Sequence, residues 1–346
     1  MKHRYILSDF YFPWITGIFI LIILGVVSCA DTDHPLPVIP DPELQTITIN
    51  TSGLATHYYS LGQKKIISSN KITDWDLRFC SQSDKYYIYL NTAKHMRIAK
   101  YDGNFQDNIN PSKISSWQWD ILKDGKALTS LGGWGDFSFT NPKSFGLTYV
   151  IDLGYLNYFQ EFGYRKITVL GFMDNQYLLK FGLLNDPDGD TIKIEKNPAY
   201  NSIYLSLVST GKVVKIEPPI TDWDLVFTQY GFANQVFNNG KVIDTAYQWT
   251  DAILLNNEGR QLASDTTKKF DDITFWDAEK YVYSSHIDFI LNKWRFYNTA
   301  TNRYEISGNN IYILKNNKNH MYKIELLSVD KTNPFQTVIG FKVKNL

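Results

Sequence analysis

The side chains that could carry catalysis are present in this chain, but they do not fall into a catalytic spacing. There is no G-x-S-x-G nucleophile elbow, no H-E-x-x-H zinc motif and no Cys–His pairing. The glycines between Leu131 and Asp136 lack both the Lys-Ser/Thr of a phosphate loop and the G-x-G-x-x-G spacing of a dinucleotide site. The isolated carboxylates Asp76 and Asp224 are explained by charged positions that alternate with apolar ones along a strand. The sequence therefore predicts that the protein is not an enzyme.

Three tryptophans could instead bind a ligand by stacking. Trp117, Trp119 and Trp134 lie in the segment 102–146, which is rich in Asn, Gly, Ser and Pro. A connection of this length is usually functional or disordered, and three tryptophans argue against disorder. Sugar rings stack on exposed aromatic side chains, so these residues are a candidate platform for a glycan.

The segments that must position these residues are organised around a string that occurs twice. The string is ITDWDL, at Ile72–Leu77 and again at Ile220–Leu225, and a phenylalanine follows two residues after each copy. Weaker similarity continues on both sides: His57–Leu61 resembles Ile203–Leu207, and Gln176–Phe181 resembles Asn319–Ile324. A repeat of about 150 residues has the size of one domain. We therefore expect two tandem, related antiparallel modules at 45–196 and 197–346.

Both modules show the pattern of short strands. Runs of four to six residues, such as Trp75–Cys80, end at Gly, Asn, Ser or Asp. Aromatic residues make up 15% of the chain, which favours strands over helices. Alternation places Trp75 on one face with Leu77 and Phe79, and Trp223 holds the same place in the second module. We therefore expect both tryptophans in the core of an all-β fold.

Residues 1–29 have the pattern of a bacterial lipoprotein signal peptide. A short basic start precedes an apolar run that closes with Ser28-Cys29. The run has about fourteen residues and a membrane span needs about 20, although an uncleaved signal anchor is the alternative. We expect Cys29 to carry the lipid and the proline-rich residues 30–44 to form a semi-rigid stalk. Basic and acidic side chains balance at 35 each, which gives no support to nucleic-acid binding.

The C-terminal half resembles a known lipoprotein family. Its strings appear in the order Trp294–Asn298, Tyr304–Ile306, Ile311–Leu314, Tyr322–Leu327 and Gly340–Lys342. Together with the WDL-x-F string, the closing Cys29 and the stalk, they are similar to the HmuY family of Bacteroidetes. The resemblance covers roughly residues 196–346, and it extends to 45–195 through the repeat.

The resemblance implies an all-β lipoprotein that is anchored by its lipid in the outer membrane, at the cell surface, and serves iron acquisition. In that family the protein captures haem and passes it to a TonB-dependent receptor, and two His or Met side chains from loops hold the iron. The alternative is a surface glycan-binding or structural β-module without haem. The sequence leaves open which face of the membrane the protein occupies and whether the first module binds anything.

The haem-ligand candidates are His286, His320 and Met321. We find no counterpart of His286 in the first module, and it lies beside aromatic residues that suit a flat porphyrin. His320 and Met321 begin a strand after a turn, at a family-like spacing from His286, although both align with residues of the first module. His57 and His95 align with isoleucines of the second module, so we expect them to occupy structural positions.

Overall fold

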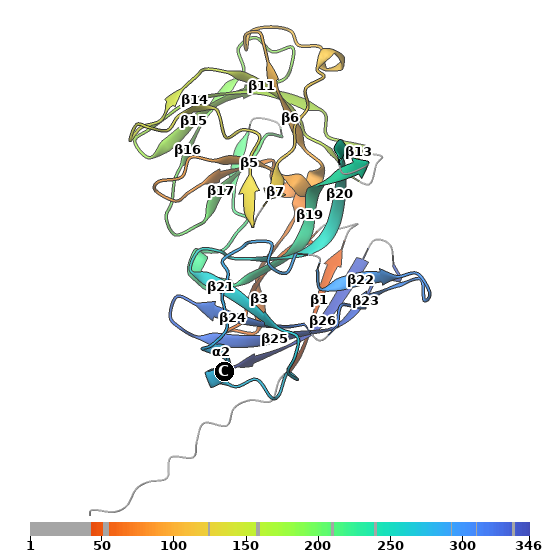
Figure 1. Cartoon of the computed structure of the whole chain (residues 1–346). Coiled ribbons are helices and arrows are strands. Elements are labelled where there is room, and N and C mark those ends of the chain that lie inside the picture. Colours follow the sequence, from red (N-terminus) through yellow and green to blue (C-terminus); the bar gives the residue numbers. More distant parts are fainter. Residues whose placement is uncertain are drawn as a thin grey trace, which may run out of the picture. The chain divides into compact units, whose positions relative to one another are not determined.

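The strand patterns form antiparallel sheets, which confirms the predicted all-β class (Figure 1). The computed structural model describes residues 43–50, 55–123, 125–156, 160–208, 211–238, 241–291, 293–308, 310–333 and 336–346. The predicted signal peptide (1–29), the lipid site Cys29 and the stalk up to residue 42 lie outside the described residues. From Asp41 onward the chain forms one compact unit. Within the described ranges, no helix is long and apolar enough to cross a membrane.

Four sheets contain most of the described strands. Sheet A has the order β1 (Glu43–Asn50), β26 (Gln336–Asn345), β25 (Met321–Asp330), β24 (Ile311–Asn316), β21 (Arg260–Asp265). Sheet B has the order β20 (Lys241–Leu255), β19 (Leu225–Asn238), β2 (Ala55–Ser60), β3 (Lys65–Lys71). Sheet C has the order β18 (Lys212–Val214), β17 (Ser202–Ser206), β4 (Leu77–Cys80), β5 (Ile88–Leu90). Sheet D has the order β16 (Asp190–Glu195), β15 (Gln176–Gly182), β14 (Tyr164–Met173), β11 (Thr148–Asp152), β6 (Arg97–Tyr101).

Short elements connect these sheets. Two-stranded ribbons are formed by β7 (Ile121–Lys123) with β8 (Lys126–Leu128), β9 (Gly135–Asp136) with β10 (Lys143–Ser144), β12 (Tyr155–Leu156) with β13 (Gln160–Glu161), and β22 (Arg295–Asn298) with β23 (Arg303–Ile306). The helical turns are η1 (Ile72–Asp74), η2 (Thr92–Lys94), η3 (Pro111–Lys113), η4 (Ile220–Asp222) and α2 (Phe275–Ala278). The segment 102–146 therefore contains two of the ribbons and one helical turn.

Strands from the two copies of the repeat are exchanged between the sheets. The β2–β3 hairpin, from the first copy, pairs with β19 of the second copy. The β17–β18 hairpin, from the second copy, pairs with β4 of the first. In the same way β1 pairs with β26. Sheets A, B and C thus combine strands from both sides of residue 196, so the pairing does not follow the tandem boundary that the sequence suggested.

The hexamer forms the same local structure in both copies. In each, the Ile-Thr-Asp part is one turn of 3₁₀ helix, η1 or η4, and the strand begins at the following leucine. The aspartates between them do not lie on an outer strand face, as alternation suggested: Asp76 is 0% exposed and Asp224 is 5% exposed. A buried carboxylate needs hydrogen bonds or an opposite charge, and each of these has both.

These carboxylates fasten the exchanged hairpins. Asp76 accepts a hydrogen bond from the Leu207 backbone N–H (2.6 Å) at the end of β17 and forms an ion pair with Lys94. Asp224 accepts one from the Leu61 N–H (2.8 Å) at the end of β2 and pairs with Arg260 (3.0 Å). The two copies of the repeat therefore hold each other through equivalent contacts.

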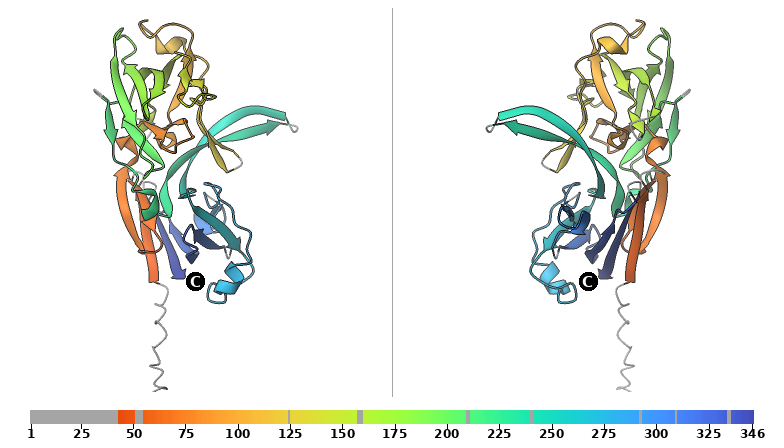
Figure 2. Two further views of the ribbon diagram at one scale, coloured as in Figure 1. Left: turned by 90° about the vertical axis from the view of Figure 1, so that its left-hand side faces the viewer. Right: turned by 90° about the vertical axis from the view of Figure 1, so that its right-hand side faces the viewer.

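The three largest clusters of buried side chains among the described residues form most of the core. One lies between sheets C and D, and a second between sheets A and B. The third joins sheets B and C and contains Tyr58, Tyr204 and Trp223, with Trp75 packed against it. Beyond this contact β19 and β20 continue as a long, curved arm (Figure 2). Trp223 is 5% exposed, as expected for a core residue, whereas Trp75 is only partly buried.

Candidate functional site

The predicted haem ligands have different surroundings in the structure. His286 is exposed and packs on Gly125 in the β7–β8 turn, because a Cβ added to Gly125 would lie 2.1 Å from the His286 Cγ. His320 is exposed in the β24–β25 turn, where its backbone N–H donates to Asn316 Oδ1 (3.0 Å). Met321 is 2% exposed in an apolar cluster. A buried core position explains Met321 without a ligand, and no hydrogen bond joins the three residues within the described part of the chain.

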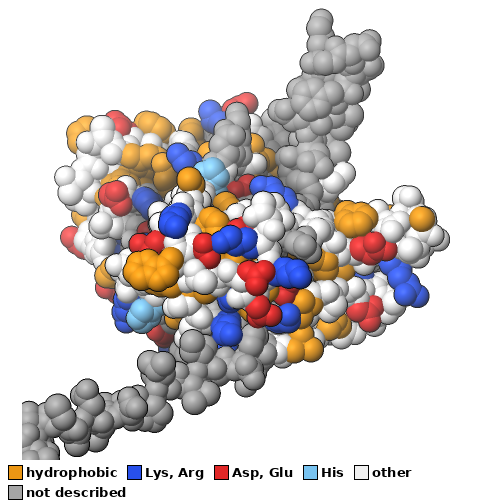
Figure 3. Space-filling model, turned by 60° about the horizontal axis from the view of Figure 1, so that its bottom comes forward, with side chains coloured by type: hydrophobic (Ala, Val, Ile, Leu, Met, Phe, Trp, Pro, Cys, Tyr) orange, Lys and Arg blue, Asp and Glu red, His pale blue; other side chains and the backbone are white. Residues whose placement is uncertain are grey.

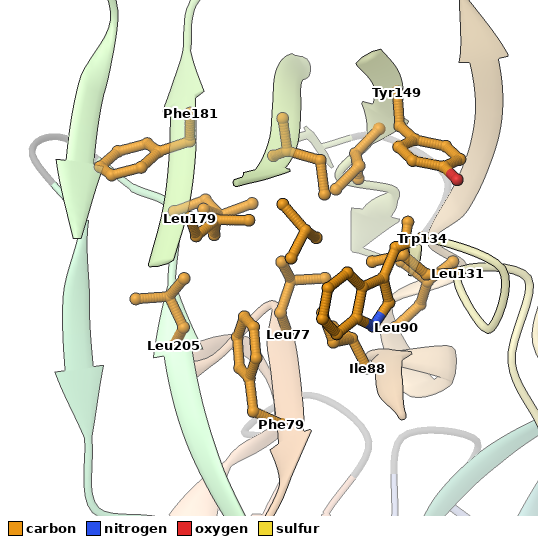
Figure 4. Close-up of a cluster of buried hydrophobic side chains, with 14 of the residues drawn as sticks. Leu77, Phe79, Ile88, Leu90, Leu131, Trp134, Tyr149, Leu179, Phe181 and Leu205 are labelled. Atoms are coloured by element: carbon orange, nitrogen blue, oxygen red, sulfur yellow. The ribbon is translucent and has the colours of Figure 1, made fainter. Parts of the chain in front are cut away.

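The three tryptophans of the predicted glycan-binding platform also differ in their surroundings. Trp134 is 1% exposed and belongs to the core cluster between sheets C and D (Figure 4). Its indole N–H donates to a backbone carbonyl (2.9 Å), so Trp134 is a satisfied core residue and cannot stack on a ligand. Trp117 is partly exposed, with the Arg97 guanidinium 4.7 Å from its ring centroid. Trp119 lines a cavity and is the platform residue that remains best placed for binding.

His57 occupies a structural position. Its Nδ1 is hydrogen-bonded to Ser69 Oγ (2.7 Å), and its Nε2 to the Thr48 carbonyl (2.9 Å). Because both ring nitrogens have partners in the protein, neither is available to a metal.

His95 lies in the same cavity as Trp119. It follows η2 with a left-handed backbone (φ 64°), and its N–H closes the helical turn on the Thr92 carbonyl. The imidazole stacks on the Trp249 ring of β20 with an interplanar angle of 7°, and the Tyr155 ring of β12 lies 4.2 Å away, centroid to centroid. The Trp249 indole N–H donates to the Thr92 carbonyl (2.9 Å), which fixes the stacking partner beside η2.

The cavity combines ring faces with charged groups in a space of about 350 Å³. Burial lowers the pKa of His95 to about 3, so its imidazole is neutral at physiological pH. Arg97 pairs with Asp152, with 2.9 Å between Nε and Oδ2. Tyr164 completes the aromatic lining. A neutral imidazole, several ring faces and a guanidinium in one hollow can bind a flat molecule that carries an acidic group.

The sequence did not reveal this group of residues. His95, Tyr155 and Trp249 come from a helical turn and two strands that are far apart in the chain, and only the folded structure brings them together. Trp119 is the one predicted site residue among them. The signal that could have drawn attention to His95 is the polar pair Asn91-Thr92 shortly before it, which suits a turn.

Comparison with protein-family models, with curated proteins and with solved structures found no match for this chain. Within the described ranges no three His, Cys, Asp or Glu side chains gather in a way that could hold a metal ion. On the face in Figure 3, acidic and basic side chains are interspersed with apolar ones. The site is therefore assigned from its own geometry, and the class that the structure shows is an all-β protein with exchanged antiparallel strands.

Proposed function

We propose that this protein captures haem and that the cavity around His95 is the binding site. The carrying observation is the position of His95: a neutral imidazole in a hollow walled by Trp119, Tyr155, Tyr164 and Trp249. Neutral imidazole is the form of histidine that ligates iron, and flat ring faces suit a porphyrin. The similarity to the HmuY strings supports haem as the ligand.

The charged residues of the cavity suit the rest of such a ligand. Haem carries carboxylate groups, and a guanidinium binds carboxylates with two parallel hydrogen bonds. Arg97 is partly exposed and has one carboxylate partner, Asp152. If Asp152 moved away, the guanidinium N–H groups of Arg97 could bind a carboxylate of the ligand. Arg97 therefore serves as the anion-binding group beside the iron-ligating His95.

Binding rather than catalysis is the role that we assign, and the cellular setting follows the sequence pattern. We place the protein in the outer membrane, held by a lipid on Cys29 and facing the cell surface, where it would deliver haem to a TonB-dependent receptor. Replacing Cys29 with Ser should abolish labelling by a radioactive fatty acid. Continued labelling would refute the anchor.

Haemin titration of the protein without residues 1–29 tests the haem proposal. The wild type should give a sharp, shifted Soret band, and His95→Asn should lose it. Asn is chosen because it tolerates the left-handed backbone (φ 64°) of this position. His286→Ala, which changes an exposed histidine outside the cavity, is the matched control and should bind as the wild type does.

Two results would contradict the proposal. If the wild type gives only the broad spectrum of free haemin, the protein does not capture haem. If His95→Asn keeps the wild-type spectrum and His286→Ala loses it, the site is at the histidine that the sequence favoured.

A glycan is the second candidate ligand, because Trp119 lies beside the Arg97–Asp152 pair and sugars need both stacking and polar partners. Affinity electrophoresis in gels that contain surface polysaccharides would test it. Retardation of the wild type that Trp119→Ala abolishes, without a haemin spectrum, would favour the glycan.

A further inference from the structure

A second cavity lies at the junction of sheets B and C, where the exchanged hairpins meet. Two equivalent edge-to-face aromatic pairs form its walls, Tyr58 with Trp223 (4.9 Å between centroids) and Tyr204 with Trp75 (5.0 Å). In each pair the tyrosine comes from an exchanged hairpin and the tryptophan from a copy of the hexamer. We call this space of about 120 Å³ the central chamber.

The repeat places equivalent aromatic pairs on both sides of the chamber, and at one equivalent position of the hexamer strands the two copies differ in charge. WDLRF in the first copy places Arg78 on the chamber wall, where WDLVF in the second copy places Val226. The Arg78 guanidinium lies 4.3 Å from the centroid of the Tyr89 ring. A basic side chain thus lines a space that also contains aromatic rings and the carboxyl groups of Asp120 and Glu217.

Arg78 differs from the other basic side chains of the interior. Lys94 and Arg260 are paired with carboxylates. Lys166 and Lys323 donate to backbone carbonyls. Within the described residues Arg78 forms no ion pair and no hydrogen bond: its guanidinium lies over the Tyr89 ring and interacts with Glu217 only through space. A guanidinium has five donors, so an anion in the chamber would complete its bonding.

The acidic groups of the chamber already have partners. Glu217 accepts from the Asn201 backbone N–H (2.5 Å) and from the Tyr204 hydroxyl (3.0 Å), one bond to each carboxylate oxygen. Asp120 accepts from the backbone N–H groups of Leu90 (2.7 Å) and Ser130 (2.8 Å). Burial raises the pKa of Glu217 to about 7, so this carboxyl carries only part of a negative charge at neutral pH.

We propose that the central chamber binds a small aromatic monocarboxylate, with its carboxylate on the Arg78 guanidinium and its ring among the tyrosine and tryptophan side chains. A buried cavity of about 150 Å³ holds benzene in another protein, and the chamber is slightly smaller, so the ring would fill it and the carboxylate would lie at Arg78, where a larger hollow adjoins. Two acidic groups beside the site exclude a multiply charged anion, because each added charge would meet a carboxylate that can ionise.

The surroundings provide a route of entry. A larger hollow of about 470 Å³ shares Arg78, Tyr89 and Asn201 with the chamber, so the two spaces adjoin at the guanidinium. Lys85 and Lys126 line this outer hollow. Lys85 is paired with Glu258 of the same hollow (2.9 Å), so Lys126 is the lysine whose charge would attract a carboxylate toward the opening.

Calorimetry with benzoate and with benzamide, its neutral analogue of the same shape, tests the proposal. The wild type should bind benzoate at least about 10-fold more tightly than benzamide, because only benzoate forms charged hydrogen bonds with the guanidinium. Arg78→Val introduces the residue of the second copy and should remove this preference. Arg303→Gln, which removes an exposed guanidinium outside the chamber and the His95 cavity, is the matched control and should keep it. If Arg78→Val does not fold, Arg78→Lys, which keeps the charge but loses the fork, should weaken benzoate binding.

The outcomes are decisive. Equal binding of benzoate and benzamide, no binding of benzoate, or an Arg78 variant that binds benzoate as well as the wild type would each overturn the proposal. Haemin binding is measured separately, so a failure here does not bear on the His95 site.

Discussion

The carboxylate of Asp224 should be essential to stability, because it joins two copies of the repeat inside the core. Its Oδ2 accepts the Leu61 backbone N–H (2.8 Å) and its Oδ1 accepts the Arg260 Nε–H (3.0 Å). Asp224→Asn preserves the shape but replaces one acceptor with an NH₂ group. The Arg260 charge then remains buried without its counter-charge.

The expected loss of stability depends on the hydrogen bonds that Arg260 retains in the Asp224→Asn variant. Removing one partner of a buried ion pair costs about 3 to 5 kcal/mol. Arg260 retains the carbonyls of Glu258 (3.2 Å) and Thr221 (3.1 Å) as acceptors, so we expect the lower end of that range, about 3 kcal/mol. At the equivalent position, Asp76→Asn should cost more, because Lys94 donates to no acceptor other than Asp76 within the described residues.

Urea unfolding of the wild type and the variants measures these costs as shifts in the midpoint at constant slope. Asp188→Asn, at an exposed turn, is the control and should shift the free energy of unfolding by less than about 0.5 kcal/mol. If Asp224→Asn is as stable as Asp188→Asn, the buried pair does not hold the exchanged hairpin, and this account of the fold is wrong.

Two further predictions concern single groups. Burial raises the pKa of Glu217 from 4.5 to about 7, so its contribution to stability is fully present below pH 4.5 and is lost as the pH rises through 7. Between pH 5 and pH 8 the wild type should lose about 2 to 3 kcal/mol more than Glu217→Gln, and parallel pH profiles in urea unfolding would contradict this. Gly154→Ala should destabilise far more than Gly163→Ala: both have positive φ (74° and 77°), but only the first Cβ meets an atom, the Lys94 carbonyl oxygen at 1.8 Å. Equal melting temperatures for the two variants would show that the contact relaxes freely.

The parts of the fold that the sequence predicted are local. Four-to-six-residue apolar runs gave the all-β class, and the repeated hexamer indicated that Trp75 and Trp223 hold equivalent places. Alternation failed for Asp76 and Asp224, because a 3₁₀ turn precedes each strand and an ion pair can satisfy a charge inside the core. Which strand pairs with which depends on contacts more than a hundred residues apart, and spacing along the chain does not encode those.

The sequence did not draw attention to the proposed site around His95 for a related reason. Asp76 and Asp224, which are equivalent in the two copies, are 148 positions apart. Further along, Ile98 forms an isolated β-bridge with Gln118, and Leu262 forms an equivalent β-bridge with Ser284. Ile98 and Leu262 are 164 positions apart. The alignment of His95 with an isoleucine used the offset of 148 residues, but in this part of the chain the two copies are offset by 164 residues.

The same β-bridges indicate which residue of the first copy corresponds to His286. Gln118 and Ser284 hold matching places, so Asp120 occupies the position of His286 in the other copy. The segment of His286 therefore does have a counterpart, in the tryptophan-rich part of the first copy. The similar strings Gln176–Phe181 and Asn319–Ile324 lie on β15 and β25. These two strands hold different places in their sheets.

The pairing of β1 with β26 has a consequence for biosynthesis. The first described strand, Glu43–Asn50, finds its partner only when Gln336–Asn345 has been made, almost at the end of the chain. The β2–β3 hairpin waits in the same way for β19. Contacts of such long sequence separation form slowly, because the entropy of closing the loop opposes them until other contacts compensate. β1 should therefore stay unpaired on the ribosome until β26 has been made, whereas β2 and β3 can pair with each other early, and a chain that stops before β26 should leave β1 as an open edge that other chains can join.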